Sequence, residues 1–559
     1  MRYNTGVINV LVVRLTFSAV AESQTGAGAR AGGWAGPRLW RLSRGHGMKA
    51  RFRLLLGAFA GLLCLASSAA SGQPEVEGLL RRHWFEARTA HFHIYSCGST
   101  QAVGRLAARL EQFRDAYALL AGAQAVASPP IVVMAFPDRE SMTPFLPLYQ
   151  GKPANLSAFF RRGSDENLIV LALSGTGADA LEIIFHEFAH LLFRHNEPYW
   201  PLWLDEGMAD LYATFQVNGN NRASIGQPLE HHLRVLAQQP LMPLRELFAV
   251  TRDSPNYNES ERQGIFYAES WLLAHYLMLG SSPARKAGFR QLTPLLRQGY
   301  SAEAAFTNAL QTSLPAIEEE LRHYLAQAVF HPLELTVEAT LASPRGMVCR
   351  PLSPVEVCFR LGDELLRLGR LDAAEAYFLE GKKLDPASPL AFEGLGLLAA
   401  QRRQTEEAVR QLEEAMKRGP VGFLAHYTYA REKYLLTSNP PETYSRLEKG
   451  PAEAIRSELK KSLALMPDFG PAHHLLGFFE LAQHEDLAAA EQHLMKSIQL
   501  EPENQAYLLT LAQAQMARND PVAARRTLEG LRRPYVPSAV RKHAEELIRE
   551  IGRAGPAGR

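Results

Sequence analysis

Residues 181–213 read LEIIFHEFAHLLFRHNEPYWPLWLDEGMADLYA, and they carry the most specific pattern in the chain. Apolar residues recur at helical spacing on both sides of a Pro-containing break, which predicts helices at about residues 178–194 and 202–216. His186 and His190 are four residues apart. Their imidazoles therefore project from one face of the first helix, one turn apart. That spacing lets both rings bind one tetrahedral zinc ion.

Glu187 directly follows the first of these histidines and can reach a metal-bound water as a general base. Ile184, Phe185 and Phe188 are among the residues that make the helix apolar on most sides. The helix is therefore expected to be buried, and its polar side chains need partners. A pair of hydrogen-bonded core histidines is the alternative interpretation, and it suits a lone histidine better than this pair.

A catalytic zinc ion needs a third protein ligand. The metzincin pattern places a Gly and a third His after the second His, but those positions hold Phe193 and Asn196. His195 is one residue out of register, and on a helix it would point about 100° away from the required direction. The metzincin arrangement is therefore excluded, and the acidic residues of the second helix become the candidates.

The two helices together, with HEFAH in the first and DEGMAD in the second, resemble those of the gluzincins, the thermolysin- and aminopeptidase-like metallopeptidases. The resemblance implies that Glu206 is the third zinc ligand. It also implies that Asp210, one turn further along, holds the Nδ1 proton of His186 and so fixes the tautomer of that ring. A solvated helix face is the alternative interpretation of these two acids, but Trp203 and the apolar residues around it indicate a buried helix.

The resemblance implies a zinc peptidase mechanism in which Glu187 takes a proton from the zinc-activated water and delivers it to the leaving amine. Tyr267 is the candidate donor to the oxyanion, although a packing role explains this residue equally well. No Gly-Ala-Met-Glu-Asn-like exopeptidase motif occurs in the chain, so an endopeptidase is favoured. The strand expected at residues 156–160 could pair with extended substrate beside the cleft.

Residues 75–345 alternate between expected strands and helices. Strands are expected at residues 91–95, 131–136, 156–160 and 168–173, and helices dominate after residue 178. This order predicts an α+β domain, and the resemblance makes that domain thermolysin-like.

Residues 354–535 repeat with a period of 34. Gly362 and Gly396 are 34 residues apart, and Pro386 and Pro420 close the same two units. Five units are in register, the third with an insertion at residues 437–451. The pattern resembles the tetratricopeptide repeat, in which each unit is a pair of antiparallel helices. An all-α solenoid is therefore expected, with an unknown protein partner, followed by a C-terminal helix and tail at residues 536–559.

The N-terminal region looks like a targeting segment. Residues 48–72 combine basic residues, an apolar stretch and small residues, as a signal peptide does. Residues 1–47 are expected to be a mis-called or disordered extension before a true start at Met48. The protein is therefore expected to be exported, periplasmic or secreted. Membrane association is expected only through an uncleaved signal.

Charge and cysteine content narrow the range of partners. The chain has 60 basic and 58 acidic residues, which gives no reason to expect nucleic acid. No pair of cysteines has the spacing of a structural zinc site. Cys349 and Cys358 flank a turn, and both a disulfide and two free thiols are compatible with the sequence.

Two functions follow from the sequence. The first is a zinc-dependent peptidase, acting on peptide or protein substrates, whose repeats recruit a substrate or partner. The alternative is a repeat-based binding or scaffold protein with a vestigial peptidase fold. The presence of His186, Glu187, His190 and Glu206 together favours the first.

Overall fold

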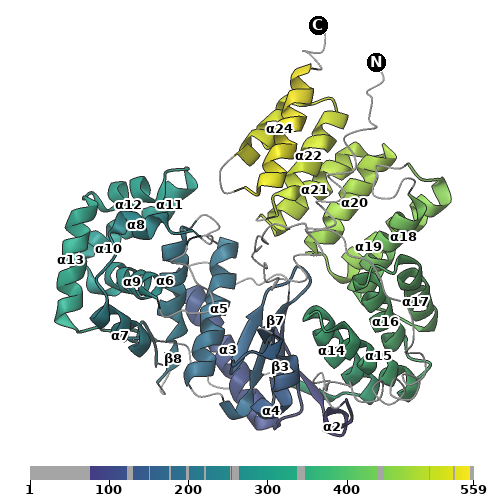
Figure 1. Cartoon of the computed structure of the whole chain (residues 1–559), viewed down its shortest axis with the longest axis horizontal. Coiled ribbons are helices and arrows are strands. Elements are labelled where there is room, and N and C mark those ends of the chain that lie inside the picture. Colours follow the sequence, from purple (N-terminus) through teal and green to yellow (C-terminus); the bar gives the residue numbers. More distant parts are fainter. Residues whose placement is uncertain are drawn as a thin grey trace, which may run out of the picture.

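The structure is a computed structural model, and it describes residues 76–121, 130–149, 151–175, 178–196, 200–218, 222–251, 254, 264–336, 347–438, 446–502, 504–532 and 536–553. A sheet lies at the centre, with a helical lobe on one side of it and a curved array of helix pairs on the other (Figure 1). The predictions for residues 1–72 lie outside the described residues.

The central sheet has six strands within the described residues, in the order β11-β1-β2-β3-β7-β6. Neighbours β2, β3 and β7 run parallel, and the other pairs are antiparallel. Every residue of β3 and β7 is buried, as expected of strands covered on both faces. The strands are β1 (Phe85–Arg88), β2 (Phe92–Ser96), β3 (Ile131–Phe136), β6 (Ala158–Arg161), β7 (Asn167–Ala172) and β11 (Val348–Pro351).

Helices α3 (Thr100–Ala121), α5 (Ala178–Asn196) and α6 (Leu202–Ala213) share one hydrophobic core with one face of this sheet. A lobe of further helices continues that core, and Figure 1 shows it in teal at the left. It comprises α7 (Glu230–Gln238), α8 (Leu244–Ala249), α9 (Ile265–His275), the π-helical turn Tyr276–Gly280, α10 (Pro283–Phe289), α11 (Leu292–Arg297), α12 (Ala302–Leu310) and α13 (Leu314–Gln327).

Shorter elements complete this half of the molecule. A second sheet has the order β10-β9-β8, and a third pairs β4 with β5. These elements are α2 (Val76–Leu80), α4 (Arg139–Met142), β4 (Leu148–Tyr149), β5 (Lys152–Pro153), β8 (Gln216–Val217), β9 (Arg222–Ile225) and β10 (Leu333–Thr336), with 3-10 turns at Thr143–Phe145 and Leu173–Gly175.

The opposite face of the central sheet is covered by the first repeats. Phe159 of β6 and Val170 of β7 belong to the same hydrophobic core as Leu361 and Phe378 of the helix pairs. Strand β11 lies immediately before the first of these helices and pairs with β1. The sheet therefore extends beyond residue 345, where the sequence placed the end of this domain, and the two halves of the chain share a core.

The C-terminal half is a solenoid of helix pairs that curves away from the sheet (Figure 1). Glycines stand where paired helices approach closely, since a Cβ on Gly396 would lie 2.6 Å from Leu412 Cγ. The helices are α14 (Pro354–Arg367), α15 (Leu371–Leu384), α16 (Pro389–Gln401), α17 (Thr405–Arg418), α18 (Phe423–Thr437), α19 (Lys449–Leu465), α20 (Gly470–Gln483), α21 (Leu487–Leu500), α22 (Ala506–Ala517), α23 (Pro521–Glu529), a 3-10 turn (Gly530–Arg532) and α24 (Ser538–Arg553).

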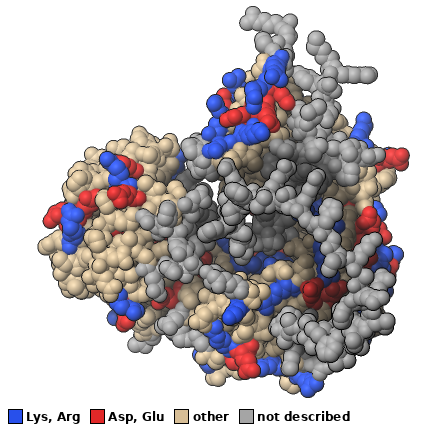
Figure 2. Space-filling view, viewed as in Figure 1, with Lys and Arg blue, Asp and Glu red and all other residues tan. Residues whose placement is uncertain are grey.

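Surface and cysteine chemistry complete the description. On the face shown in Figure 2, basic and acidic side chains are interspersed rather than segregated. Cys349 is exposed, Cys358 is buried, and both are free thiols, so the disulfide alternative does not hold. Within the described residues, no helix combines the length and apolar character needed to cross a membrane.

Candidate metal centre

The candidate metal centre lies between α5 and α6. Every residue of α6 from Trp203 to Ala213 is buried, because this helix packs between α5 and α9. A Cβ on Gly207 would lie only 2.2 Å from the Ser270 carbonyl oxygen of α9, a distance that real Cβ atoms essentially never show. The close approach of α6 and α9 therefore depends on glycine at the position next to Glu206.

Three ligand-type atoms converge in this centre. The Nε2 atoms of His186 and His190 are 3.0 Å apart. Glu206 Oε2 lies 3.5 Å from the first nitrogen and 3.4 Å from the second. Atoms bound at 2.0–2.1 Å to one tetrahedral zinc ion lie about 3.3 Å from each other. The triangle of donor atoms thus fits a single zinc ion.

The other nitrogen of each imidazole faces a carboxylate. His186 Nδ1 lies 2.7 Å from Asp210 Oδ1, and His190 Nδ1 lies 2.9 Å from Asp205 Oδ1. When each Nδ1–H donates to its carboxylate, the Nε2 lone pairs of both rings point toward Glu206 and toward one another. Carboxylates in this position orient a metal-binding histidine and raise its basicity.

Electrostatics in the centre favour a positive charge among the donor atoms. Burial opposes ionisation of Glu206, but the adjacent imidazoles of His186 and His190 hold the pKa of this carboxyl group well below its usual range. Burial likewise opposes the charged form of His190, yet Asp205 and Glu206 raise the pKa of this ring well above its usual value. The protein therefore stabilises a cation here, which can be a proton on His190 or a metal ion that displaces it.

Asp210 is held by a second histidine. His232 Nε2, on α7, lies 2.7 Å from Asp210 Oδ2, and His232 is 1% exposed. Burial opposes ionisation of Asp210, but His232 and His186 together hold its pKa well below the usual range. The carboxylate is thereby fixed as an acceptor for the Nδ1–H of His186.

Two of the residues predicted to be catalytic occupy different surroundings. Glu187 is half-buried, whereas its neighbours His186 and Phe188 are buried, so the glutamate reaches the accessible side of α5. Tyr267 is buried in α9, the helix whose Ser270 carbonyl faces Gly207, and its ring contacts Phe266. Its role as oxyanion donor stays a prediction.

Sequence reasoning did not assign Asp205 or His232 to this centre. Asp205 directly precedes Glu206, so its position one residue before a proposed ligand was the available signal. His232 belongs to the His231-His232 pair, 22 residues after Asp210, and its side chain reaches the centre through the packing of α7 on α9. No spacing pattern in the sequence predicts the contact between His232 and Asp210.

Comparison with known proteins concerns the solenoid. Models of the tetratricopeptide repeat match residues 355–388 and 481–542. The matched segments are tetratricopeptide repeats. These two matches, one near each end of the solenoid, confirm the predicted repeats. Repeats of this kind present protein-binding surfaces and indicate a scaffold role.

One curated relative and several solved structures are similar to parts of this chain. Cellulose synthase operon protein C of Komagataeibacter sucrofermentans is 25% identical over 215 residues, which cover 37% of this chain and 15% of that protein. YrrB, described as a TPR protein with an unusual peptide-binding site, is 14% identical, with a TM-score of 0.28 over 34% of this chain and 90% of its own. The Pseudomonas aeruginosa protein pilF is 17% identical, with a TM-score of 0.27 over 36% and 93%.

Proposed function

We propose that this protein is a zinc-dependent endopeptidase, exported from the cytoplasm, whose repeats bind a protein substrate or partner. The observation that carries the proposal is the convergence of His186 Nε2, His190 Nε2 and Glu206 Oε2 at separations of 3.0–3.5 Å. The two-histidine, one-glutamate donor set is that of catalytic zinc sites with a fourth position left for water or substrate. The proposed export rests on the signal-like residues 48–72.

His186, His190 and Glu206 would hold the zinc ion, which when bound would supply the Lewis acidity that acidifies water and polarises a carbonyl. The protein side chains supply the rest of the reaction. Glu187 accepts the proton of the attacking water and passes it to the leaving nitrogen as the peptide bond breaks. Asp205 and Asp210 hold the two imidazoles in the tautomer that presents Nε2.

The edge of the central sheet supplies a place for the substrate backbone. Strand β6 is the last strand in the described sheet, it pairs with β7, and α5 packs against it. An extended peptide that adds to such an edge gains backbone hydrogen bonds, and side-chain pockets then give specificity. Substrate bound along β6 would lie beside the helix that carries His186, Glu187 and His190.

A binding or scaffold function without peptidase activity is the second candidate. It is favoured by the matches to tetratricopeptide repeats at residues 355–388 and 481–542, which concern the solenoid alone. In that case the metal centre would be a structural site that ties α5 to α6. The two candidates differ in what Glu187 does, because a structural zinc site has no use for a general base.

The test is hydrolysis of denatured casein by the full chain, with zinc content measured on the same samples. We expect the Glu187→Gln variant to retain its zinc and to lose activity by about 10²–10⁴-fold, the usual contribution of a general acid–base group. Chelation should abolish activity, and zinc should restore it. Wild-type protein that holds zinc but cleaves nothing would favour the scaffold function. Equal cleavage by wild type and variant would contradict the mechanism.

A further inference from the structure

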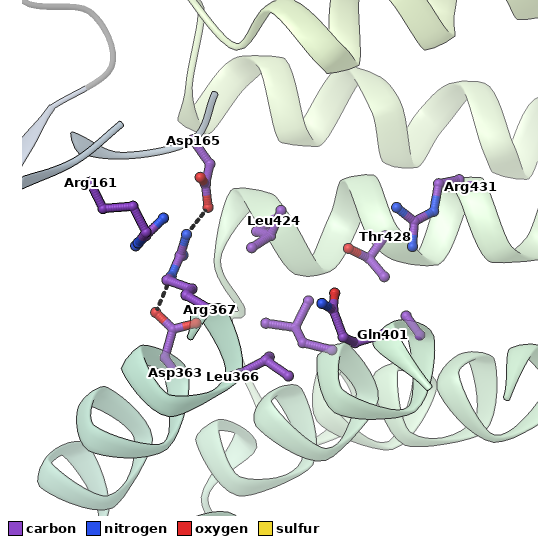
Figure 3. Close-up of a pocket in the computed structure, with 11 residues that line it drawn as sticks. Arg161, Asp165, Asp363, Leu366, Arg367, Gln401, Leu424, Thr428 and Arg431 are labelled. Atoms are coloured by element: carbon purple, nitrogen blue, oxygen red, sulfur yellow. Dashed lines mark hydrogen bonds and ion pairs between the residues drawn. The ribbon is translucent and has the colours of Figure 1, made fainter. Parts of the chain in front are cut away.

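A cluster of charged side chains joins the β6–β7 hairpin to the first repeats (Figure 3). This arginine cluster consists of Arg161, Asp165 and Glu166 of the hairpin and Asp363 and Arg367 of α14. Arg367 Nη1 contacts Asp165 Oδ2, and Arg367 Nε lies 3.0 Å from Asp363 Oδ2 and 3.4 Å from Glu166 Oε1. Only 2% of the Asp165 side chain and 13% of the Arg367 side chain are exposed. The tip of a hairpin of the sheet is therefore held by a guanidinium of the solenoid.

A small pocket of about 40 Å³ lies next to this contact. Asp165 and Arg367 line a pocket that continues between α16 and α18, where Gln401, Thr428 and Arg431 form its far side (Figure 3). The wall of this pocket therefore includes the guanidinium that holds the hairpin.

The strand held in this way is the edge strand β6. Its residues alternate between two cores, because Ala158 packs in the core that contains α5 and Phe159 packs in the core that contains α14. Arg161, at the end of the strand, lies 3.7 Å from Glu166 and 3.9 Å from Glu364 of α14. Strand β6 is thus sandwiched between the helix of the metal centre and the first repeat.

We propose that Arg367 is a positioning residue for β6, which holds this edge strand in place for peptide binding. The proposal rests on the peptidase function proposed above. A peptide that adds to a sheet edge needs the edge strand held in one register, since a shift of one residue reverses which side chains face the cleft. Arg367 supplies that constraint through Asp165, without touching substrate or metal.

A substitution in the turn of the hairpin would perturb the Asp165–Arg367 contact independently of Arg367. A Cβ on Gly163 would lie 2.9 Å from Asp165 Oδ1 and 2.7 Å from the Glu166 carbonyl oxygen. A methyl group at this position therefore displaces either the Asp165 carboxylate or the backbone of the turn. Gly163→Ala perturbs the contact from the hairpin side, and Arg367→Gln perturbs it from the solenoid side.

The experiment measures amide hydrogen exchange of residues 158–172 in the full chain, together with zinc content, kcat and KM for a casein-derived peptide. The variants are Arg367→Gln, Arg367→Lys and Asp165→Asn. We expect Arg367→Gln to speed exchange in this segment and to raise KM, each by about tenfold, with zinc content and kcat within about twofold of wild type. Arg367→Lys keeps the positive charge and should therefore change hydrogen exchange and KM less than Arg367→Gln does.

Arg456→Gln is the matched control, because Arg456 is a similarly buried arginine that pairs with Glu480 in a later repeat at 2.7 Å. It should leave exchange at residues 158–172 and KM unchanged. Asp165→Asn keeps the side-chain shape and decides the same question if Arg367→Gln fails to fold. Unchanged exchange in both variants, or an equal effect of Arg456→Gln, would overturn the proposal. If the wild type cleaves no peptide, the peptidase function fails, whereas hydrogen exchange still decides whether Arg367 holds β6.

Discussion

The arginine cluster and the metal centre differ in the groups that face their buried carboxylates. In the arginine cluster, the Arg367 guanidinium contacts the carboxylates of both Asp165 and Asp363. In the metal centre, imidazoles face carboxylates, and the pKa values of Glu206 and His190 shift in the directions that favour an added positive charge. In the first cluster the carboxylates thus face guanidinium groups, whereas in the second they face imidazoles whose Nε2 atoms converge on Glu206, the geometry on which the proposed zinc site rests.

Removal of a metal-ligating side chain should have the largest effect on zinc affinity, whereas a change in the arginine cluster should have none. His190→Ala deletes one of three protein donors, and we expect zinc affinity to fall by at least about a thousandfold, roughly 4 kcal/mol. Asp363→Asn alters the arginine cluster instead and should leave zinc affinity unchanged. Competition with a chromophoric chelator measures both values. Zinc affinity that survives His190→Ala would remove the metal centre from the account.

The carboxylates behind the histidines should have the next largest effect. Asp205→Asn and Asp210→Asn keep the shape of the side chain but weaken the hold on Nδ1, and each should lower zinc affinity by about 10–100-fold. The same chelator competition measures the loss. The assignment of these residues as orienting groups fails if either variant binds zinc as tightly as the wild type.

The metal centre and the repeats also show which features could be predicted from the sequence alone. The spacing of His186 and His190 lies within one helix, and the 34-residue period relates neighbouring repeats. Both features depend on residues close together in the sequence, so both were predictable. The pairing of β11 with β1 joins residues more than 250 positions apart, since Arg350 faces Glu86. The cover of α14 on the sheet depends on the same long-range packing. A buried strand such as β3 indicates that both faces are covered, but it does not name the covering helix.

Glycines at close helix contacts in the metal centre and in the solenoid allow a paired test, in which we expect smaller effects on zinc affinity. Gly207→Ala places a methyl group 2.2 Å from the Ser270 carbonyl oxygen, and we expect α6 to shift at a cost of about 1–3 kcal/mol in unfolding free energy. Zinc affinity should fall as well, because Glu206 adjoins the altered position. Gly477→Ala should destabilise the solenoid similarly, since its Cβ would lie 2.7 Å from Leu494 Cγ. Its zinc affinity should stay at the wild-type level, as denaturant melts and chelator competition can show.

Glu269 shows what a buried carboxyl group does when neither an arginine nor a metal balances it. Burial raises its pKa from 4.5 to about 8, despite a 2.6 Å hydrogen bond from the Met242 N–H, and Glu318 adds to the increase. Since the pKa is higher in the folded state than in the unfolded state, the protonated group stabilises the fold at low pH. This stability is lost as the pH rises from about 4.5 through about 8.

The Glu269→Gln variant should therefore lack this pH dependence while keeping an acceptor for the Met242 N–H. We expect its unfolding free energy to exceed that of the wild type by about 3–4 kcal/mol at pH 8.5 relative to the difference at pH 5. Urea denaturation followed by circular dichroism at the two pH values measures the change. Parallel pH profiles for variant and wild type would show that Glu269 ionises normally.

The central claim is that the chain binds one zinc ion through His186, His190 and Glu206. X-ray absorption at the zinc edge, on full-length protein loaded with one equivalent of zinc, tests it most directly. The predicted spectrum shows nitrogen and oxygen neighbours at about 2.0–2.1 Å, with the outer-shell signature of two imidazoles. The imidazole signature should weaken in His190→Ala. A first shell that contains sulfur, or a wild-type spectrum without imidazole scattering, would contradict the account.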